Sequence, residues 1–95
     1  MTRYILLLLS LILASCVSES PAKYVALSFD DGPNETTTVQ MLDILEEFDV
    51  PASFFVIGQN INDSTARQMT RAIELGCEIQ NHSYSHSFMS RLSAE

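Results

Sequence analysis

Two clusters of polar residues in this chain carry side chains that can bind a metal ion. Asp30 and Asp31 are adjacent carboxylates at the point where an apolar run gives way to a turn, and His82 and His86 are four positions apart much later in the chain. Imidazole nitrogens and carboxylate oxygens are both zinc ligands. One carboxylate and two imidazoles would leave a fourth position for water, which is the pattern of catalytic rather than structural zinc.

Each cluster alone has a plainer interpretation. Asp, Gly and Pro all suit turns, so the segment Asp30-Asp31-Gly32-Pro33 is by itself compatible with a simple turn. His82 and His86 alone are compatible with polar loop residues. Both clusters follow strand-like runs in one short chain, however, and this shared placement favours a metal site.

We interpret Asp31, His82 and His86 as the metal ligands and Asp30 as the general base. On a helical turn, histidines spaced i, i+4 would project from one face, as they do in zinc proteases. Position 83 is Ser rather than the Glu that those proteases use, so the base must come from elsewhere, and Asp30 is adjacent to the ligand. Zinc lowers the pKa of a bound water to about 7, and Asp30 would take its proton. Two histidines and one carboxylate also suit ferrous iron, but zinc is our first choice.

Three strand-like runs are positioned to bring these clusters together. They cover residues 24–29, 52–57 and 77–81, and the first two are nearly continuous apolar runs, as expected of parallel strands covered on both faces. Residues at the carboxyl ends of parallel strands converge on one face, where ligands bind. The order of these runs and the segments between them predict an α/β fold with three parallel strands and two helices.

The two segments between the strands have the periodicity of amphipathic helices. We expect Thr36-Thr37-Thr38 and Asp63-Ser64 to cap their N-termini, and Gly76 to follow the second helix as its C′ residue. The expected core positions recur three or four residues apart and are Met41, Ile44, Leu45 and Phe48 in the first helix, and Met69, Ala72, Ile73 and Gly76 in the second.

The N-terminal segment has the features of an export signal. Residues 1–15 combine the basic Arg3 with an apolar run that is shorter than the roughly 20 residues a membrane-spanning helix needs, which indicates a secretory signal peptide. Leu13-Ala14-Ser15-Cys16 resembles the lipobox of bacterial lipoproteins. We therefore expect a lipidated Cys16 at the mature N-terminus, a short linker over residues 16–22, and a protein exported to the bacterial cell envelope and anchored to a membrane. The alternative is a simple cleaved signal with an incidental cysteine.

Charge and cysteine content limit the possible partners. Without residues 1–15 the chain has four basic and twelve acidic residues, a net charge of −8, which argues against nucleic acid as a partner. No basic cluster follows Cys16, so lipid chains would do the anchoring, and stable attachment takes more than one chain. With Cys16 lipidated, Cys77 has no intramolecular partner and is expected to be a small buried hydrophobic residue.

Three segments, residues 24–33, 51–58 and 78–86, closely resemble the N-terminal part of a polysaccharide deacetylase of the carbohydrate esterase 4 type, also called the NodB homology domain. The likeness covers residues 23–95. It implies the N-terminal portion of a distorted (β/α) barrel, with Asp30 as base and with Asp31, His82 and His86 as metal ligands. It also implies removal of acetyl groups from N-acetylglucosamine polymers or, in some branches, of O-acetyl groups from xylan.

The chain departs from the family pattern in two ways. Gln80 replaces an expected Gly, and Cys77 stands where a polar residue is common. The family's later motifs are absent: an Arg-rich segment, an Asp-Trp segment and a Leu-x-His that supplies the catalytic acid. A (β/α) barrel has about 250 residues, with a minimum of roughly 200, so we expect residues 23–95 to be a truncated domain.

The sequence analysis therefore leaves several functional interpretations open. The first is a lipid-anchored, metal-dependent hydrolase that cleaves the carbon–nitrogen bond of acetyl amides in a polysaccharide such as peptidoglycan or a chitin-like glycan. The second is a truncated, catalytically inactive lipoprotein that binds metal or glycan, and the third is a branch of the family acting on small amides. In each case we expect the 95-residue chain alone to be inactive, because no residue is in an evident position to protonate the leaving amine.

Overall fold

The computed structural model describes residues 20–93. The expected signal peptide over residues 1–15 and the expected lipidation site at Cys16 lie outside this range, and so does most of the linker over 16–22. The regular elements, in chain order, are β1 (Ser28–Gly32), α2 (Thr37–Phe48), β2 (Ser53–Val56), the short 3-10 turn η1 (Gly58–Asn60), α3 (Asp63–Glu74), β3 (Glu78–Asn81) and a second 3-10 turn, η2 (Met89–Arg91).

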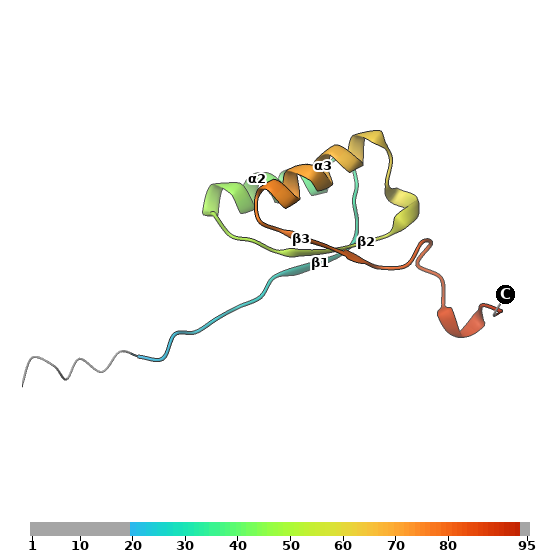
Figure 1. The fold of residues 1–95 in the computed structure, drawn as a ribbon, viewed down its shortest axis with the longest axis horizontal. Helices are drawn as coiled ribbons and strands as arrows, with labels where there is room; N and C mark the ends of the chain where they lie inside the picture. Colours follow the sequence, from blue (N-terminus) through green and yellow to red (C-terminus); the bar gives the residue numbers. More distant parts are fainter. Residues whose placement is uncertain (1–19, 94–95) are drawn as a thin grey trace, which may run out of the picture.

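The three strands form one parallel sheet in the order β1-β2-β3. This confirms the predicted α/β architecture with three parallel strands and two helices. Figure 1 shows α2 and α3 on the same side of the sheet, as right-handed crossovers between successive neighbouring strands require. Within residues 20–93, helices therefore cover one face of the sheet, whereas the apolar runs had predicted cover on both.

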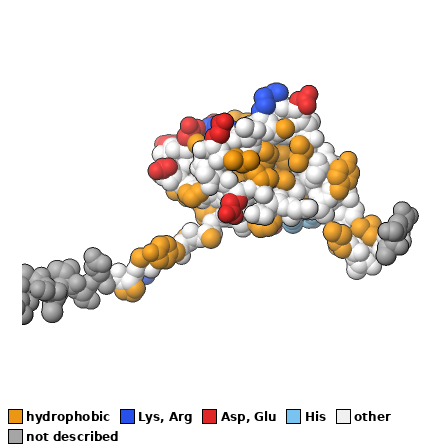
Figure 2. Space-filling model, in the orientation of Figure 1, with side chains coloured by type: hydrophobic (Ala, Val, Ile, Leu, Met, Phe, Trp, Pro, Cys, Tyr) orange, Lys and Arg blue, Asp and Glu red, His pale blue; other side chains and the backbone are white. Residues whose placement is uncertain are grey.

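The first strand begins later than its apolar run predicts. Pairing in register starts at Ser28, opposite Ser53, and the segment of this chain just before Ser53 is the α2–β2 loop with Pro51. Among the residues that the structure describes, no strand pairs with Tyr24 or Val25, and their side chains are 90% and 86% exposed. Figure 2 shows hydrophobic side chains along this extended segment and gathered on the visible face of the folded part.

The core lies between the sheet and the two helices. The buried cluster consists of Leu42, Leu45, Ala52, Phe54, Val56, Met69, Ala72 and Cys77. Phe54 and Val56 alternate with the half-buried Ser53 and Phe55 along β2, which is the expected strand periodicity. Cys77 is a free buried thiol, which confirms its predicted role as a small hydrophobic residue.

The helices bury only part of the apolar stripe predicted for each, since Leu45 in α2 and Met69 and Ala72 in α3 are buried as predicted and other positions are not. In α2, Leu42 is fully buried, whereas Ile44 and Phe48 are 50% and 68% exposed. Thr38 is also buried. Its hydroxyl accepts a hydrogen bond from the backbone N–H of Asn34 at 3.0 Å, so the buried polar group has a partner. In α3, Thr65 is buried in the same way and Ile73 is exposed. A prediction from apolar residues alone does not identify threonines that are buried with their hydroxyls hydrogen-bonded.

The N-cap of α3 differs from the prediction, whereas Thr36 as the N-cap residue of α2 and the glycine after α3 agree with it. Asn62, rather than Asp63-Ser64, caps α3, and it forms a reciprocal capping box with Thr65. The side chain of Asn34 accepts hydrogen bonds at the start of α2, where Thr36 makes no side-chain cap. Gly76 follows α3 with φ +82°, as predicted for a C′ residue.

Candidate metal centre

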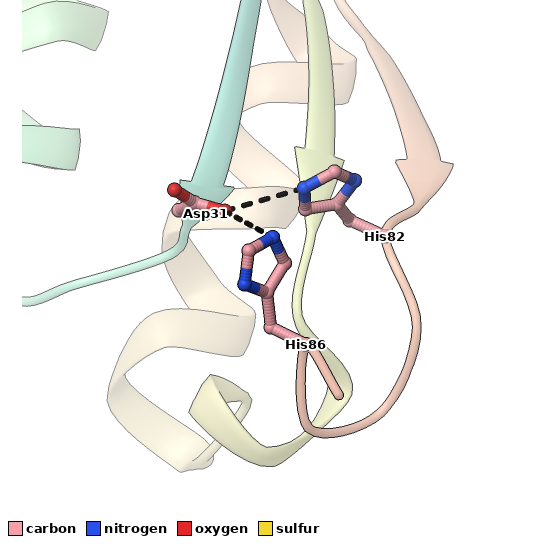
Figure 3. Close-up of side chains that lie close together, drawn as sticks. All are labelled: Asp31, His82 and His86. Atoms are coloured by element: carbon pink, nitrogen blue, oxygen red, sulfur yellow. Dashed lines mark ion pairs between the residues drawn. The ribbon is translucent and has the colours of Figure 1, made fainter. Parts of the chain in front are cut away.

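A bulge in β1 changes the direction of the Asp31 side chain relative to the side chains of its neighbours in the strand. Asp30 pairs with Phe55 and Gly32 pairs with Val56, so Asp31 is an extra residue between two paired positions. Its φ of 71° lies in the left-handed region. Bulges re-aim side chains and occur next to active sites, and here the bulge turns the carboxylate of Asp31 toward the loop that follows β3 (Figure 3).

The two histidines are brought together by a bent loop and not by the predicted helical turn. His82 is still tied to the sheet, because its backbone N–H donates to the carbonyl of Val56 at 2.9 Å. The chain then folds back through Ser83 and His86, both with positive φ, 64° and 54°. The side chain of Asn81 accepts from the Ser83 N–H at 2.6 Å, and Ser83 Oγ accepts from the His86 N–H at 2.9 Å. These two hydrogen bonds hold the loop in a bend that brings the imidazole of His86 next to that of His82.

Asp31, His82 and His86 converge on one point, as Figure 3 shows. Asp31 Oδ1 lies 3.2 Å from His82 Nε2 and 3.4 Å from His86 Nε2. The imidazole ring centroids are 4.9 Å apart. The structure thus brings together all three side chains that the sequence analysis proposed as ligands.

These distances are compatible with a shared metal ion, and the three ligand atoms all lie within 4.8 Å of one another. Charged N–H···O hydrogen bonds are about 2.7–2.9 Å long, and both contacts to Asp31 are longer, at 3.2 and 3.4 Å. With metal–ligand bonds of about 2.0–2.2 Å, the ligand atoms of a tetrahedral zinc are about 3.3–3.6 Å apart. The donor set and its spacing therefore fit a divalent metal.

Backbone strain is concentrated at this site. Among residues 20–93, the non-glycine residues with positive φ are Asp31, Asp49, Ser83 and His86. Asp49 caps the end of α2, Asp31 and His86 are candidate ligands, and Ser83 lies in the loop between the two histidines. Left-handed conformations cost non-glycine residues about 1–2 kcal/mol each, and such strain persists where surrounding contacts hold it, often at functional sites.

Asp30, the predicted base, lies beside the cluster but is not a member of it. It precedes the bulge and is in register with Phe55. Asp30 and Asp31 both line a cavity of about 220 Å³ whose walls include Phe29 and Met41. The residues that line this cavity thus include both aspartates but neither histidine, and of the two aspartates it is Asp31 that contacts the histidines.

The sequence analysis missed residues that support the centre without belonging to it. The ring of Phe55 packs edge-on against that of His82, with centroids 6.4 Å apart. The backbone N–H groups of Gly58 and Gln59 donate to the histidine loop, and the side chain of Asn60 donates to Asp31. The only signal in the sequence is a glycine directly after a strand, which marks a tight turn but does not identify its partners.

No helix in the part of the chain that the structure describes is long and apolar enough to cross a membrane.

Comparison with known proteins identifies relatives of this chain. The family model described as polysaccharide deacetylase matches residues 18–95. A bifunctional xylanase/deacetylase from Pseudobutyrivibrio xylanivorans is 50% identical over 72 residues, which are 76% of this chain and 12% of that protein.

Solved structures agree with this match. A family 4 acetyl xylan esterase from Clostridium thermocellum, solved in complex with a cobalt ion, is 49% identical with a TM-score of 0.70, and the match covers 75% of this chain and 35% of the esterase. A peptidoglycan deacetylase from Bacillus subtilis is 42% identical with a TM-score of 0.71, and covers 77% and 36% of the two chains. This chain therefore spans about a third or less of the length of these relatives, and it corresponds to the N-terminal portion of a (β/α) barrel.

Proposed function

The chain belongs to the polysaccharide deacetylase family, and from this premise we propose that it carries part of the active site of a metal-dependent deacetylase acting on an acetylated polysaccharide. The observation that carries the proposal is the convergence of Asp31, His82 and His86 on one point. These residues come from two distant segments, and two of them need a strained backbone to meet. An arrangement of this kind is expected of a functional site.

Asp31, His82 and His86 would hold one divalent ion. Two imidazoles and one carboxylate suit zinc, our first choice, and also ferrous iron. The cobalt ion in the related Clostridium thermocellum esterase supports a divalent metal in this family. When bound, the metal would act as a Lewis acid and would lower the pKa of a water bound to it.

Asp30 is proposed as the general base. It is adjacent in the chain to a ligand and lines the same cavity as that ligand, and its carboxylate lies outside the ligand cluster. A carboxylate that is free of the metal can accept the proton of a water that attacks the acetyl carbonyl. This division of roles explains why two adjacent carboxylates are needed.

The leaving amine also needs a proton donor. The chain has two histidines, and both are proposed ligands. Of the two carboxylates at the cavity, Asp31 is a ligand and Asp30 the base. We therefore propose that residues 20–93 bind the metal and activate water but do not complete the reaction. An inactive lipoprotein that binds metal or glycan remains the alternative.

The proposed substrate is a polymer of N-acetylglucosamine, such as peptidoglycan or a chitin-like glycan, whose acetyl carbon–nitrogen bond is hydrolysed. The names of two further relatives, a peptidoglycan-N-acetylglucosamine deacetylase from Bacillus cereus and a chitooligosaccharide deacetylase from Sinorhizobium fredii, support this class. A second candidate is O-acetylated xylan, favoured by the identities of 50% and 49% to relatives whose names refer to xylan. We also propose export to the cell envelope with a lipid anchor at Cys16, so that the protein would meet extracellular glycan.

Acetate release tests the proposed function. The gene's full protein product would be assayed on peptidoglycan, acetylated chitooligosaccharides and acetylated xylan, with and without a chelator. We expect release from one of these polymers, loss of release with the chelator, and recovery when zinc is restored. Release that is insensitive to the chelator, or that survives Asp31→Ala, would contradict the proposal.

A further inference from the structure

The 3-10 turn η1 (Gly58–Asn60) contributes no metal ligand, yet it contacts both halves of the candidate metal centre. We propose that Asn60 is a positioning residue that holds Asp31 in the orientation required for metal binding, and that η1 sets the separation between Asp31 and the histidine loop. The inference rests on the proposed function, because it assumes that Asp31, His82 and His86 bind a metal.

The contact to Asp31 is made at the bulge. Nδ2 of Asn60 donates a hydrogen bond to the backbone carbonyl of Asp31 at 3.1 Å. A bulged residue stands outside the regular ladder of its strand, and Asp31 also has the unfavourable φ of 71°. The Asn60 amide fixes the peptide plane that follows Asp31, and thereby the backbone from which the carboxylate projects.

Asn60 is itself held in place. Its backbone N–H donates to the carbonyl of Ile57 at 3.0 Å, and its carbonyl accepts from Thr65 Oγ1 at 2.9 Å. Thr65 is 2% exposed and belongs to the capping box of α3 with Asn62. The donor to Asp31 is therefore anchored to the rigid start of a helix.

The same turn holds the histidine loop through its backbone. The N–H groups of Gly58 and Gln59 donate to the carbonyls of Ser83 and Tyr84 at 3.0 and 2.9 Å. A Cβ on Gly58 would lie 2.9 Å from Cδ2 and 3.4 Å from Cα of Tyr84. The absence of a side chain at Gly58 is thus what lets the loop between His82 and His86 approach the turn so closely.

Small displacements of Asn60 and of η1 are expected to lower the metal affinity. Functional side chains must be held within about 0.5 Å of their productive geometry, and changes to groups that orient ligands typically weaken metal binding about 10–100-fold. Asn60→Asp is nearly isosteric but replaces the N–H donor with an oxygen that faces the Asp31 carbonyl. Gln59→Ala is a matched control, because Gln59 contacts the loop through its backbone N–H.

The test is metal titration of the gene's full protein product and of its Asn60→Asp, Asn60→Ala and Gln59→Ala variants. Binding of Co²⁺ is followed by its visible absorption, binding of Zn²⁺ by calorimetry, and metal-free stability by thermal unfolding. We expect both Asn60 variants to bind each ion on the order of 10-fold more weakly, with a changed Co²⁺ spectrum. We expect Gln59→Ala to match the wild type and all metal-free proteins to unfold at similar temperatures.

Three other results would overturn the inference. If the wild type binds neither ion, the proposed metal site fails together with the inference. If the wild type binds metal and the Asn60 variants equal it in affinity and spectrum, the metal site stands and the positioning role of Asn60 fails. If the Asn60 variants lose their fold without metal while Gln59→Ala keeps it, Asn60 has only a structural role.

Discussion

Oδ1 of Asp31 lies 3.2 Å from Nε2 of His82, although β1 and β3 are opposite edges of the three-stranded sheet. The strand β2 lies between them, so neither side chain would reach the other from a regular strand. The bulge in β1 and the loop after β3 carry both side chains over the end of β2. The candidate metal centre therefore depends on two departures from regular structure.

We predict that the two adjacent aspartates have separable roles. Alanine at Asp31, His82 or His86 should remove bound metal, because each change deletes one of three ligands. Asp30→Asn should keep the metal and abolish acetate release in the gene's full protein product, because a base is not needed for binding. Metal analysis and an acetate assay on the same preparations check this. Loss of metal in Asp30→Asn, with metal retained in Asp31→Asn, would show that the roles are reversed.

We predict that the Ser83 hydroxyl positions the second histidine. Ser83 Oγ accepts from the His86 N–H at 2.9 Å, and Ser83→Ala removes this bond from a loop with two left-handed residues. Metal affinity measured by titration should fall on the order of 10-fold. Ser85→Ala is the control, because Ser85 pairs with Ser87 in the same loop. Equal affinities in the two variants would contradict this role.

We predict that Cys16 is lipidated. Cys16→Ser should release the protein from the membrane fraction or leave it unprocessed, because a serine cannot carry the thioether-linked lipid. Membrane fractionation and intact mass measure both effects. Cys77→Ser is a control in the same chain, since Cys77 is buried in the core and has no part in anchoring. Unchanged partitioning and mass in Cys16→Ser would refute the lipoprotein interpretation.

Arg71 links the two helices, and we predict a small contribution to stability. Its guanidinium bonds Glu46 and lies 2.7 Å from Asp43, and these two carboxylates raise the pKa of Arg71. Because the pKa is raised, the contribution of Arg71 is fully present below the ordinary pKa of an arginine and is lost only as the pH rises through the raised pKa. Arg71→Ala should lower the free energy of unfolding by about 0.2–1 kcal/mol, and less at high salt.

Urea unfolding at low and high salt measures this effect. Arg67→Ala is the control, because Arg67 lies on the same helix and forms no ion pair with the residues that the structure describes. Equal effects of the two substitutions would show that the link between the helices contributes nothing measurable.

The parallel fold and the three proposed ligands were predictable because each depends on a local pattern. Apolar runs mark strands, and successive strands that run parallel bring their carboxyl ends to one edge. The backbone conformation that brings the ligands together was not predictable, since the i, i+4 spacing of His82 and His86 suits a helical turn as well as the bent loop. The roles of Asn60 and Gly58 depend on hydrogen bonds and close approaches between distant segments, which have no periodic signature.

The helix faces were predicted only in part, because Leu45, Met69 and Ala72 are buried as predicted whereas Ile44 and Ile73 are exposed. Thr38 and Thr65 are buried because their hydroxyls form hydrogen bonds near the N-termini of their helices. Burial of a polar group is favourable only when such a partner is present, and the partners are fixed by the folded loops before each helix. Hydropathy alone therefore chose the more apolar but exposed residues Ile44 and Ile73.

We predict, finally, that the 95-residue chain alone releases no acetate from acetylated chitooligosaccharides, even with zinc present. The reaction needs a proton donor for the leaving amine, and both histidines and Asp31 are proposed ligands while Asp30 is the proposed base. Packing gives a second reason. β1 and β3 are the edges of the described sheet, and large apolar side chains such as Phe48 and Ile73 are more than half exposed, which favours association over a stable monomer.

Adding the part of the barrel that residues 1–95 do not contain separates these two causes. The 95-residue chain and a version extended with the later two-thirds of a related barrel would be compared by acetate release, zinc content and sedimentation. We expect zinc-dependent release from the extended protein alone, weak zinc binding by the short chain, and a tendency of the short chain to self-associate. If the short chain bound zinc tightly as a monomer but released no acetate, the missing proton donor would be the cause of inactivity rather than poor packing. Zinc-dependent acetate release by the short chain would show that residues 1–95 already hold every group the reaction requires.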